Sequence, residues 1–212
     1  TYTQRAETNF KAIDNISLTI RRGESLGVVG VNGSGKSTLL RMLAGFLEPS
    51  EGHVIQHCKI QAMINLNAGF MPELSGLENI KLAATLFGVE KRDVARFEEE
   101  VLDFADIGDF INAPVKNYSS GMRARLGYSV SSLIGAELLL IDEVLAVGDA
   151  QFQNKCRAHI EQLKRQGTSI ALVSHSNTHI MQLCDTSLWL DKGVHMASGH
   201  TKLVLEQYQN YI

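Results

Sequence analysis

The chain has 212 residues, of which 44% are hydrophobic and 20% are charged. These proportions are typical of a globular domain and exclude the disordered, collagen-like and low-complexity classes. Lysine and arginine number 20 against 23 acidic residues, which gives a net charge of -3, and aromatic residues make up only 7%. Proteins that bind nucleic acid through phosphates or base stacking are usually basic or aromatic-rich, so nucleic acid is disfavoured as the main partner.

The three cysteines, Cys58, Cys156 and Cys184, lie far apart in the sequence and form no CxxC pair. We therefore expect buried thiols in a reducing compartment rather than a disulfide framework or a zinc site. No apolar run reaches the roughly 18 residues that cross a membrane, and the polar N-terminus predicts no signal peptide. Any role at a membrane would then depend on a partner protein.

The first 65 residues predict the start of a parallel α/β unit. Alternating apolar residues over 15–20 indicate a half-buried strand, and the apolar run over 25–30 indicates a fully buried one. Leucines and a phenylalanine at helical spacing predict a helix over 36–46. Two shorter β-like runs follow, around Val54 and over 60–64.

From Pro72 to about Gly135 the pattern is mostly helical, with Val94, Phe97, Val101 and Phe104 on one helix face and a further helix over 120–133. The remaining elements are predicted as strands over 138–141, 169–173, 187–190 and 194–197, with helices over 151–166, after 173 and at the C-terminus. The sequence therefore predicts an α/β core that is interrupted by a helical insertion of roughly 60 residues.

Residues 30–38, GVNGSGKST, fit the phosphate-loop pattern G-x-x-x-x-G-K-[ST] between a buried strand and a helix. The glycines let successive backbone N–H groups turn inward, where they and the helix N-terminus bind phosphate oxygens. Lys36 supplies a positive charge for the β- and γ-phosphates, and Ser37 offers its hydroxyl to Mg2+. The predicted nucleotide-binding residues are Gly30, Asn32, Gly33, Ser34, Gly35, Lys36, Ser37 and Thr38.

The predicted strand over 138–141 ends in two acids, Asp142 and Glu143. Two acids after a strand can form a solvated turn, but the phosphate loop upstream favours a functional pair. Asp142 is suited to hold Mg2+ through water, and Glu143 is suited to orient or deprotonate an attacking water.

These motifs, in this order, resemble the ATP-binding-cassette (ABC) ATPases over essentially the whole chain. Residues 118–122, YSSGM, stand where the family has its LSGGQ signature. Ser119 and Gly121 match that pattern, whereas Ser120 and Met122 depart from it. As an isolated pentapeptide the segment would be a helix cap. The resemblance implies that it contacts the γ-phosphate of ATP held by a second subunit.

The resemblance also implies roles for residues outside the signature. Asp149 stands at the place of the D-loop aspartate at the dimer seam, and His175 stands at the place of the switch histidine that positions Glu143 and water. Glu143, His175 and Lys36 are then the catalytic residues. The implied fold is an ABC cassette with a mainly parallel core sheet, an N-terminal antiparallel β portion and an inserted helical subdomain. The single domain, 1–212, would comprise an ATPase core over 1–70 and 136–212 and a helical subdomain over 71–135.

Two family sites match this sequence poorly. The aromatic residue that stacks on adenine is expected near the N-terminus, where Tyr2 is the first candidate and Phe10 the alternative. The Q-loop glutamine is expected shortly before Pro72, but only Asn65 or Asn67 is available there as an oxygen ligand or water holder. The missing glutamine puts in doubt how strongly nucleotide binding is linked to a permease.

Three stretches resemble one branch of the family, the ATPase subunits of bacterial polysaccharide exporters for O-antigen, capsule or teichoic acid. They are YSSGM, the EVLAVGD run over 143–149 followed by Phe152 and Lys155, and AGFMPELSGLENI over 68–80. The resemblance implies an ATPase at the cytoplasmic face of the bacterial inner membrane that powers export of a lipid-linked polysaccharide through a separate permease. Some O-antigen members carry a further C-terminal carbohydrate-binding domain.

The same resemblance implies ATP and Mg2+ as cofactors and a head-to-tail dimer with two ATP molecules in its interface. The permease and, indirectly, the lipid-linked polysaccharide are the other expected partners. Nucleic acid is not expected as a partner. The open alternatives are another ABC transporter, a soluble cassette that acts on nucleic acid or the ribosome, and a non-hydrolysing regulatory cassette. The negative charge and the lack of a second cassette, coiled-coil or zinc insertion disfavour the soluble cassette. The intact Lys36, Asp142, Glu143 and His175 disfavour the regulatory one.

Overall fold

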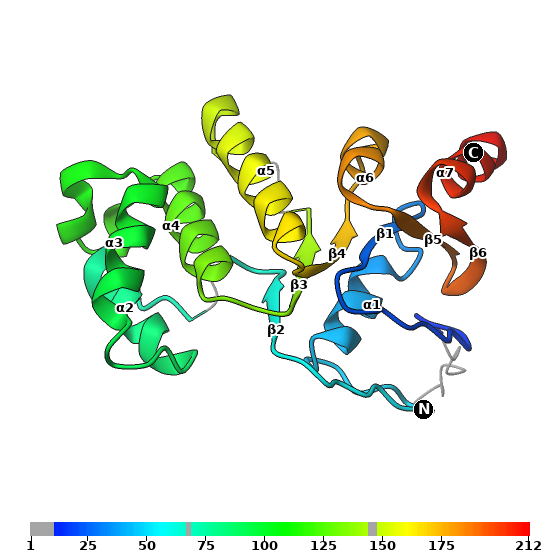
Figure 1. The fold of residues 1–212 in the computed structure, drawn as a ribbon, viewed down its shortest axis with the longest axis horizontal. Coiled ribbons are helices and arrows are strands. Elements are labelled where there is room, and N and C mark those ends of the chain that lie inside the picture. Colours follow the sequence, from blue (N-terminus) through cyan, green and yellow to red (C-terminus); the bar gives the residue numbers. More distant parts are fainter. Residues whose placement is uncertain (1–10, 67–68, 144–147) are drawn as a thin grey trace, which may run out of the picture.

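The computed structural model describes residues 11–66, 69–143 and 148–212 (Figure 1). A six-stranded sheet forms its centre, in the order β2-β3-β4-β1-β5-β6. The pairings from β2 to β5 are parallel, and β6 pairs with β5 in the antiparallel sense. The strands are β1 (Ser25–Val29), β2 (Ile60–Met63), β3 (Leu138–Asp142), β4 (Ser169–Val173), β5 (Thr186–Asp191) and β6 (Val194–His200).

Helices cover both faces of the sheet. Figure 1 shows α5, α6 and α7 along one side and α1 on the other, with α2, α3 and α4 gathered beyond β2. These three helices lie between β2 and β3 in the chain, as the predicted insertion requires. The helices are α1 (Lys36–Leu43), α2 (Gly76–Leu86), α3 (Val94–Ala105), α4 (Ser120–Leu133), α5 (Ala150–Arg165), α6 (Asn177–Leu183) and α7 (Thr201–Tyr211), with 3-10 turns η1 (Gly108–Asn112) and η2 (Val115–Asn117).

The buried apolar side chains form three clusters that follow this arrangement. Alternate residues of β3 separate to the two faces of the sheet, because successive side chains of a strand point in opposite directions. Leu139 and Ile141 join the cluster under α5 and α6, whereas Leu138 and Leu140 join the cluster over α1. The third cluster lies within α2, α3 and α4, and includes Phe97 and Val101 on the predicted face of α3.

The predicted strand over 15–20 is not a strand in the structure, and within the described residues no strand precedes β1. The predicted alternation is nevertheless physical, since Ile16, Leu18 and Ile20 pack against the cluster over α1. Alternation reports which face is buried, whereas a strand also requires a hydrogen-bonded neighbour. The β-like run around Val54 likewise forms no strand, and Val54 and Ile55 are exposed.

The first helix is shorter than its apolar spacing predicts. It ends at Leu43 instead of continuing to Phe46, which is 69% exposed. Gly45 adopts a left-handed φ of 75°, a conformation that commonly terminates helices. The other predicted boundaries differ from the structure by a few residues at most, and those of α4 and β4 are the same.

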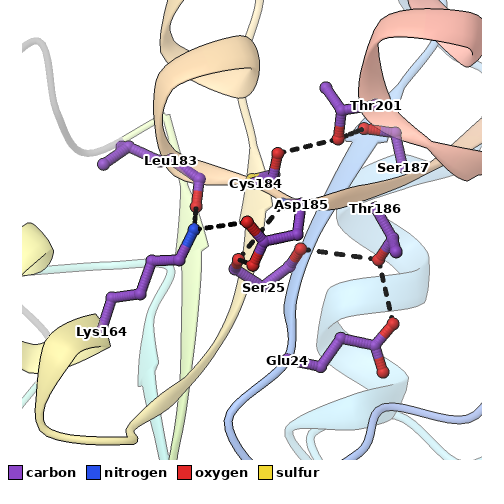
Figure 2. Close-up of polar contacts among 9 residues, drawn as sticks. All are labelled: Glu24, Ser25, Lys164, Leu183, Cys184, Asp185, Thr186, Ser187 and Thr201. Atoms are coloured by element: carbon purple, nitrogen blue, oxygen red, sulfur yellow. Dashed lines mark hydrogen bonds and ion pairs between the residues drawn. The ribbon is translucent and has the colours of Figure 1, made fainter.

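A polar cluster joins the amino ends of β1 and β5, at the edge of the sheet opposite the phosphate loop (Figure 2). The Asp185 carboxylate accepts hydrogen bonds from the Ser25 hydroxyl at 2.5 Å and the Lys164 ammonium at 2.9 Å. Desolvation opposes ionisation, but these two donors outweigh it and hold the pKa of Asp185 below its ordinary value. Thr186 and Thr201 extend the cluster to Glu24 and to the Cys184 carbonyl. The cluster therefore fixes this edge by side-chain bonds.

The prediction of buried thiols without a disulfide is confirmed for Cys156 and Cys184 but is wrong for the free Cys58. Burial raises the pKa of the Cys156 and Cys184 thiols to about 12, so both stay neutral near physiological pH. Cys58 is exposed. Among the helices of the described residues, none combines the length and the apolar character needed to span a membrane.

Candidate nucleotide-binding site

Three neighbouring parallel strands deliver the predicted catalytic side chains to one edge of the sheet. Residue 30 follows β1, Glu143 follows β3 and His175 lies two residues after β4. β4 lies between β1 and β3 and pairs with both. Because parallel strands point the same way, their carboxyl ends meet at one edge, where open α/β sheets commonly bind ligands.

The phosphate loop connects β1 to α1 in the predicted way. Gly30 has a φ of 149°, and a Cβ there would lie 2.2 Å from the Leu190 carbonyl oxygen. Gly35, the residue before α1, has a φ of 103°, and a Cβ there would lie 2.5 Å from the Ala12 carbonyl oxygen. Any larger residue at either position would have to displace backbone. The two glycines are therefore required by the backbone conformation of the loop and by its close approach to Leu190 and Ala12.

The Lys36 ammonium lies inside this loop. It donates hydrogen bonds to the carbonyl oxygens of Gly30 at 2.8 Å and Val31 at 2.9 Å, and the residue is only 6% exposed. Desolvation lowers the pKa of Lys36, and the nearby Glu143 and Asp142 carboxylates act in the opposite direction. The lysine is thus a buried cation that faces both acids.

Glu143 and His175 are in direct contact. His175 Nε2 lies 2.6 Å from Glu143 Oε1, and both side chains are about half exposed. The Glu143 backbone N–H donates to the Val173 carbonyl, which continues the pairing of β3 and β4 by one residue. Glu143 has a φ of 57°, a left-handed conformation that costs about 1–2 kcal/mol for a residue with a Cβ. Such strain, held by a neighbouring strand, is typical of functional positions.

The predicted signature residues begin α4 and lie around an open cleft. Ser119 is the N-cap of α4, and its hydroxyl accepts a hydrogen bond from the Met122 N–H at 3.1 Å. Residues 119–122 line a cleft of about 540 Å3, which Gly148 and Asp149 also line. The segment is therefore a helix cap that also borders an accessible surface.

Asp149 stands at the start of α5 and serves as its N-cap. Its Oδ1 atom accepts a hydrogen bond from the Phe152 N–H at 2.9 Å. That bond, together with the Arg125 guanidinium, lowers the pKa of Asp149. The residue is thus held as an anion beside the signature cleft.

The phosphate loop and the signature do not share one cleft among the described residues. The cleft around 119–122 contains no residue of 30–38. Figure 1 shows α1 and α4 on opposite sides of β2 and β3. A single copy of the chain therefore presents two separate surfaces.

The remaining candidates lie partly outside the described residues. Tyr2, its alternative Phe10, and Asn67 all lie outside them. Asn65 is exposed and lies two residues after β2.

Known proteins are similar to this chain, some in sequence and some in fold. Residues 13–146 match the family described as "ABC transporter". The chain belongs to the ABC transporter family. The resemblance predicted from the motifs is therefore confirmed.

Relatives in this family include polysaccharide export proteins. The chain is 43% identical to the "ABC transporter protein AbcA" of Aeromonas salmonicida, over 96% of this chain and 66% of that protein. It is 41% identical to the "O-antigen export system ATP-binding protein RfbB" of Klebsiella pneumoniae, over 94% and 81%. It is 39% identical to the "Teichoic acids export ATP-binding protein TagH" of Shouchella clausii, over 99% and 58%. The chain thus spans between about three fifths and four fifths of these relatives, two of which are named for the export of O-antigen or teichoic acids.

Solved ABC structures confirm the fold. An ATP-binding subunit of an ABC transporter superposes with a TM-score of 0.83 at 21% identity, covering 96% of this chain and 90% of that one. A dimeric ATP-binding cassette in a post-hydrolysis state, bound to ADP and Pi, gives a TM-score of 0.75 at 20% identity, with 90% of both chains covered. The predicted α/β cassette architecture is therefore correct, although its N-terminal antiparallel β portion does not appear among the described residues.

Asn79 was not among the predicted site residues. It anchors the loop over 71–75, which leads into the helical insertion. The side chain is 1% exposed, accepts a hydrogen bond from the Met71 N–H, and donates to the carbonyls of Met71, Leu74 and Ser75. The same loop accepts backbone bonds from η2, because the Val115 N–H donates to Leu74. The loop is thus joined to the segment that leads into the signature. The available signal was an asparagine at the helical spacing of the otherwise small or apolar residues that α2 buries.

We predict that Asn79→Ala lowers the free energy of unfolding by about 1–3 kcal/mol, because it leaves buried loop groups without their partner. Thr85→Ala is the matched control on the same helix, since its hydroxyl bonds only the exposed Lys81 carbonyl. The control should change the free energy by less than about 0.5 kcal/mol. Urea denaturation measures both, and equal small effects would show that Asn79 does not anchor the loop.

Proposed function

We propose that this chain is the ATP-hydrolysing subunit of an ABC exporter that moves a lipid-linked cell-surface polysaccharide across the bacterial inner membrane through a separate permease. The observation that carries the ATPase part is the convergence of Lys36, Glu143 and His175 at one edge of the sheet. The named functions of the similar RfbB and TagH proteins support the polysaccharide part.

The phosphate loop fits a nucleoside triphosphate. The Ser34 hydroxyl is buried and has no hydrogen-bond partner among the described residues, and the space around Gly33 is open. The Lys36 ammonium is bound only to loop carbonyls, which phosphate oxygens can replace. Gly30, Asn32, Gly33, Ser34, Gly35, Lys36, Ser37 and Thr38 are the proposed phosphate-binding residues, and Tyr2 is proposed for adenine.

The Ser37 hydroxyl and the Asp142 carboxylate would hold Mg2+, because both supply the hard oxygen ligands that this ion prefers. Bound Mg2+ would neutralise charge on the β- and γ-phosphates. The protein's own catalytic group is Glu143, which would accept a proton from water as the water oxygen attacks the γ-phosphorus and the bond to the bridging oxygen breaks. His175, 2.6 Å from the carboxylate, would hold it in place.

Residues 71–135 would form a helical subdomain, and residues 1–70 and 136–212 would form the ATPase core. The signature of the subdomain, with Ser119, Ser120, Gly121 and Met122, would cover ATP bound to a second copy in a head-to-tail dimer, because one copy presents the two surfaces separately. Asp149 would lie at the seam. Asn65 or Asn67 would take the place of the Q-loop glutamine, and the insertion would transmit opening and closing to a permease at the cytoplasmic face of the membrane.

We predict that Glu143→Gln lowers kcat for ATP hydrolysis at least 100-fold, since a general base typically contributes a factor of 10^2 to 10^4. ATP binding should change less than threefold, because the phosphate loop is untouched. Lys36→Ala should instead abolish tight binding. Phosphate release and fluorescent-nucleotide titration measure the two quantities.

The control is Glu137→Gln, the same substitution in the residue before β3. The Glu137 carboxylate accepts a hydrogen bond from the Lys59 N–H at 3.3 Å and lies 4.0 Å from the Arg22 guanidinium. The control should retain hydrolysis within twofold of the unsubstituted chain. Rapid hydrolysis by Glu143→Gln would remove Glu143 from the proposed role.

The polysaccharide assignment predicts that deleting the gene, in a strain without a redundant exporter, traps lipid-linked glycan on the cytoplasmic side. The unsubstituted gene should restore surface glycan, and Glu143→Gln should not. Fractionation with glycan detection measures the distribution. Normal surface glycan in the deletion strain would reject this substrate class, while an active ATPase in vitro would leave the nucleotide chemistry standing.

A further inference from the structure

Arg125 lies on α4, six residues after Ser119, and reaches two other elements. Its Nη2 atom donates to Asp149 Oδ2 at the start of α5 at 2.5 Å. Its Nη1 atom donates to the Asp106 carbonyl at the end of α3 at 3.2 Å. The guanidinium also lies 5.1 Å from the centre of the Phe152 ring on α5. One side chain therefore connects the ends of three helices.

The Arg125 side chain is largely withdrawn from solvent, at 20% exposed, whereas its partner Asp149 is 59% exposed. A planar guanidinium can donate hydrogen bonds within its plane while its face stacks on an aromatic ring, whereas an ammonium group has no planar face to stack. The position of the Arg125 head is thus fixed by three contacts of different kinds.

Lys155, on α5, makes a second connection between α5 and the end of α3. Its contacts in this connection do not include Asp149. Its ammonium donates to the carbonyls of Asp103 and Phe104 at 3.0 and 3.1 Å and lies 4.7 Å from the centre of the Phe104 ring. Both cations hold the carboxyl end of α3, but only Arg125 also holds the α5 cap. Substituting Lys155 would therefore weaken the junction alone, whereas substituting Arg125 would also release Asp149.

The cleft beside Ser119 has Arg125 and Asp149 in its wall. In the proposed dimer this surface faces the nucleotide of the second copy, and Asp149 lies six residues after the proposed base Glu143 of the same chain. The ion pair consequently joins the part of a chain that would act on the second copy's ATP to the part that follows its own catalytic strand.

We infer that Arg125 is a positioning residue that locks the signature face of α4 to the Asp149 cap of α5, so that the two proposed ATP sites are assembled together. The inference rests on the proposed function. Arg125 itself is not assigned a contact with ATP or with the reacting atoms.

The test compares Arg125→Ala with Lys155→Ala as the matched control. Arg125→Ala should lower kcat for ATP at least tenfold and change the nucleotide dissociation constant of the phosphate loop less than twofold. Lys155→Ala removes two hydrogen bonds and a ring contact at the same junction, yet should keep kcat within twofold. Equal losses of kcat in both variants, tracking their loss of stability, would overturn the inference.

Asp149→Asn provides the partner substitution, since asparagine retains the N-cap of α5 but lacks the charge. Asp149→Asn should resemble Arg125→Ala, the double variant should be no worse than either single one, and Arg125→Lys should recover only part of kcat. Multiplying losses in the double variant would mean that the two residues act independently and would contradict the lock.

Amide hydrogen exchange gives a readout that does not require turnover. Arg125→Ala should speed exchange at the starts of both α4 and α5, whereas Lys155→Ala should act at the end of α3. If the unsubstituted chain proves unable to hydrolyse ATP, the proposed ATPase function fails, and this exchange pattern still decides the lock. Unchanged exchange at the starts of α4 and α5 in Arg125→Ala would reject it.

Discussion

The parallel pairing of β4 with both β1 and β3 is the constraint on which the rest of the site depends. It places the phosphate loop, Glu143 and His175 at the ends of three adjacent strands, although up to 145 positions separate them in the sequence. Backbone hydrogen bonds set this spacing, and the polar cluster around Asp185 secures the opposite edge of the sheet. The left-handed Glu143 is then held by its bond to the Val173 carbonyl, so the strain at the base is supported by the same ladder.

The helical group adds a second surface that the core cannot provide. Asn79 and the backbone bonds to η2 join the entry loop to the segment before the signature, and Arg125 and Lys155 hold the other end of the group to α5. The insertion is therefore tied to α5 of the core by polar side-chain contacts as well as by apolar packing. The signature cleft lies at one of these junctions, which is why Asp149 borders it.

Local chemistry explains which features the sequence could predict. The phosphate loop was predictable because its glycines are required by local backbone conformation, and β3 and β4 were predictable because buried parallel strands are continuous apolar runs. The strand predicted over 15–20 was wrong because alternating apolar residues indicate which face is buried, but not whether the segment pairs with another strand. The contact of Arg125 with Asp149, and the hydrogen bonds of Asn79 to its loop, could not be predicted. They depend on how helices pack, and no local pattern specifies the partner.

We propose that each chain carries halves of two different ATP sites. The most direct measurement is the mass in solution, by sedimentation velocity, of the Glu143→Gln chain with ATP and Mg2+, alone and combined with Ser119→Trp. We expect Glu143→Gln to form a dimer with ATP and to stay a monomer with ADP. With Ser119→Trp added, the chain should remain a monomer that still binds ATP. Equal ATP-dependent dimerisation with and without Ser119→Trp would contradict the claim that the signature of one copy closes the site of the other.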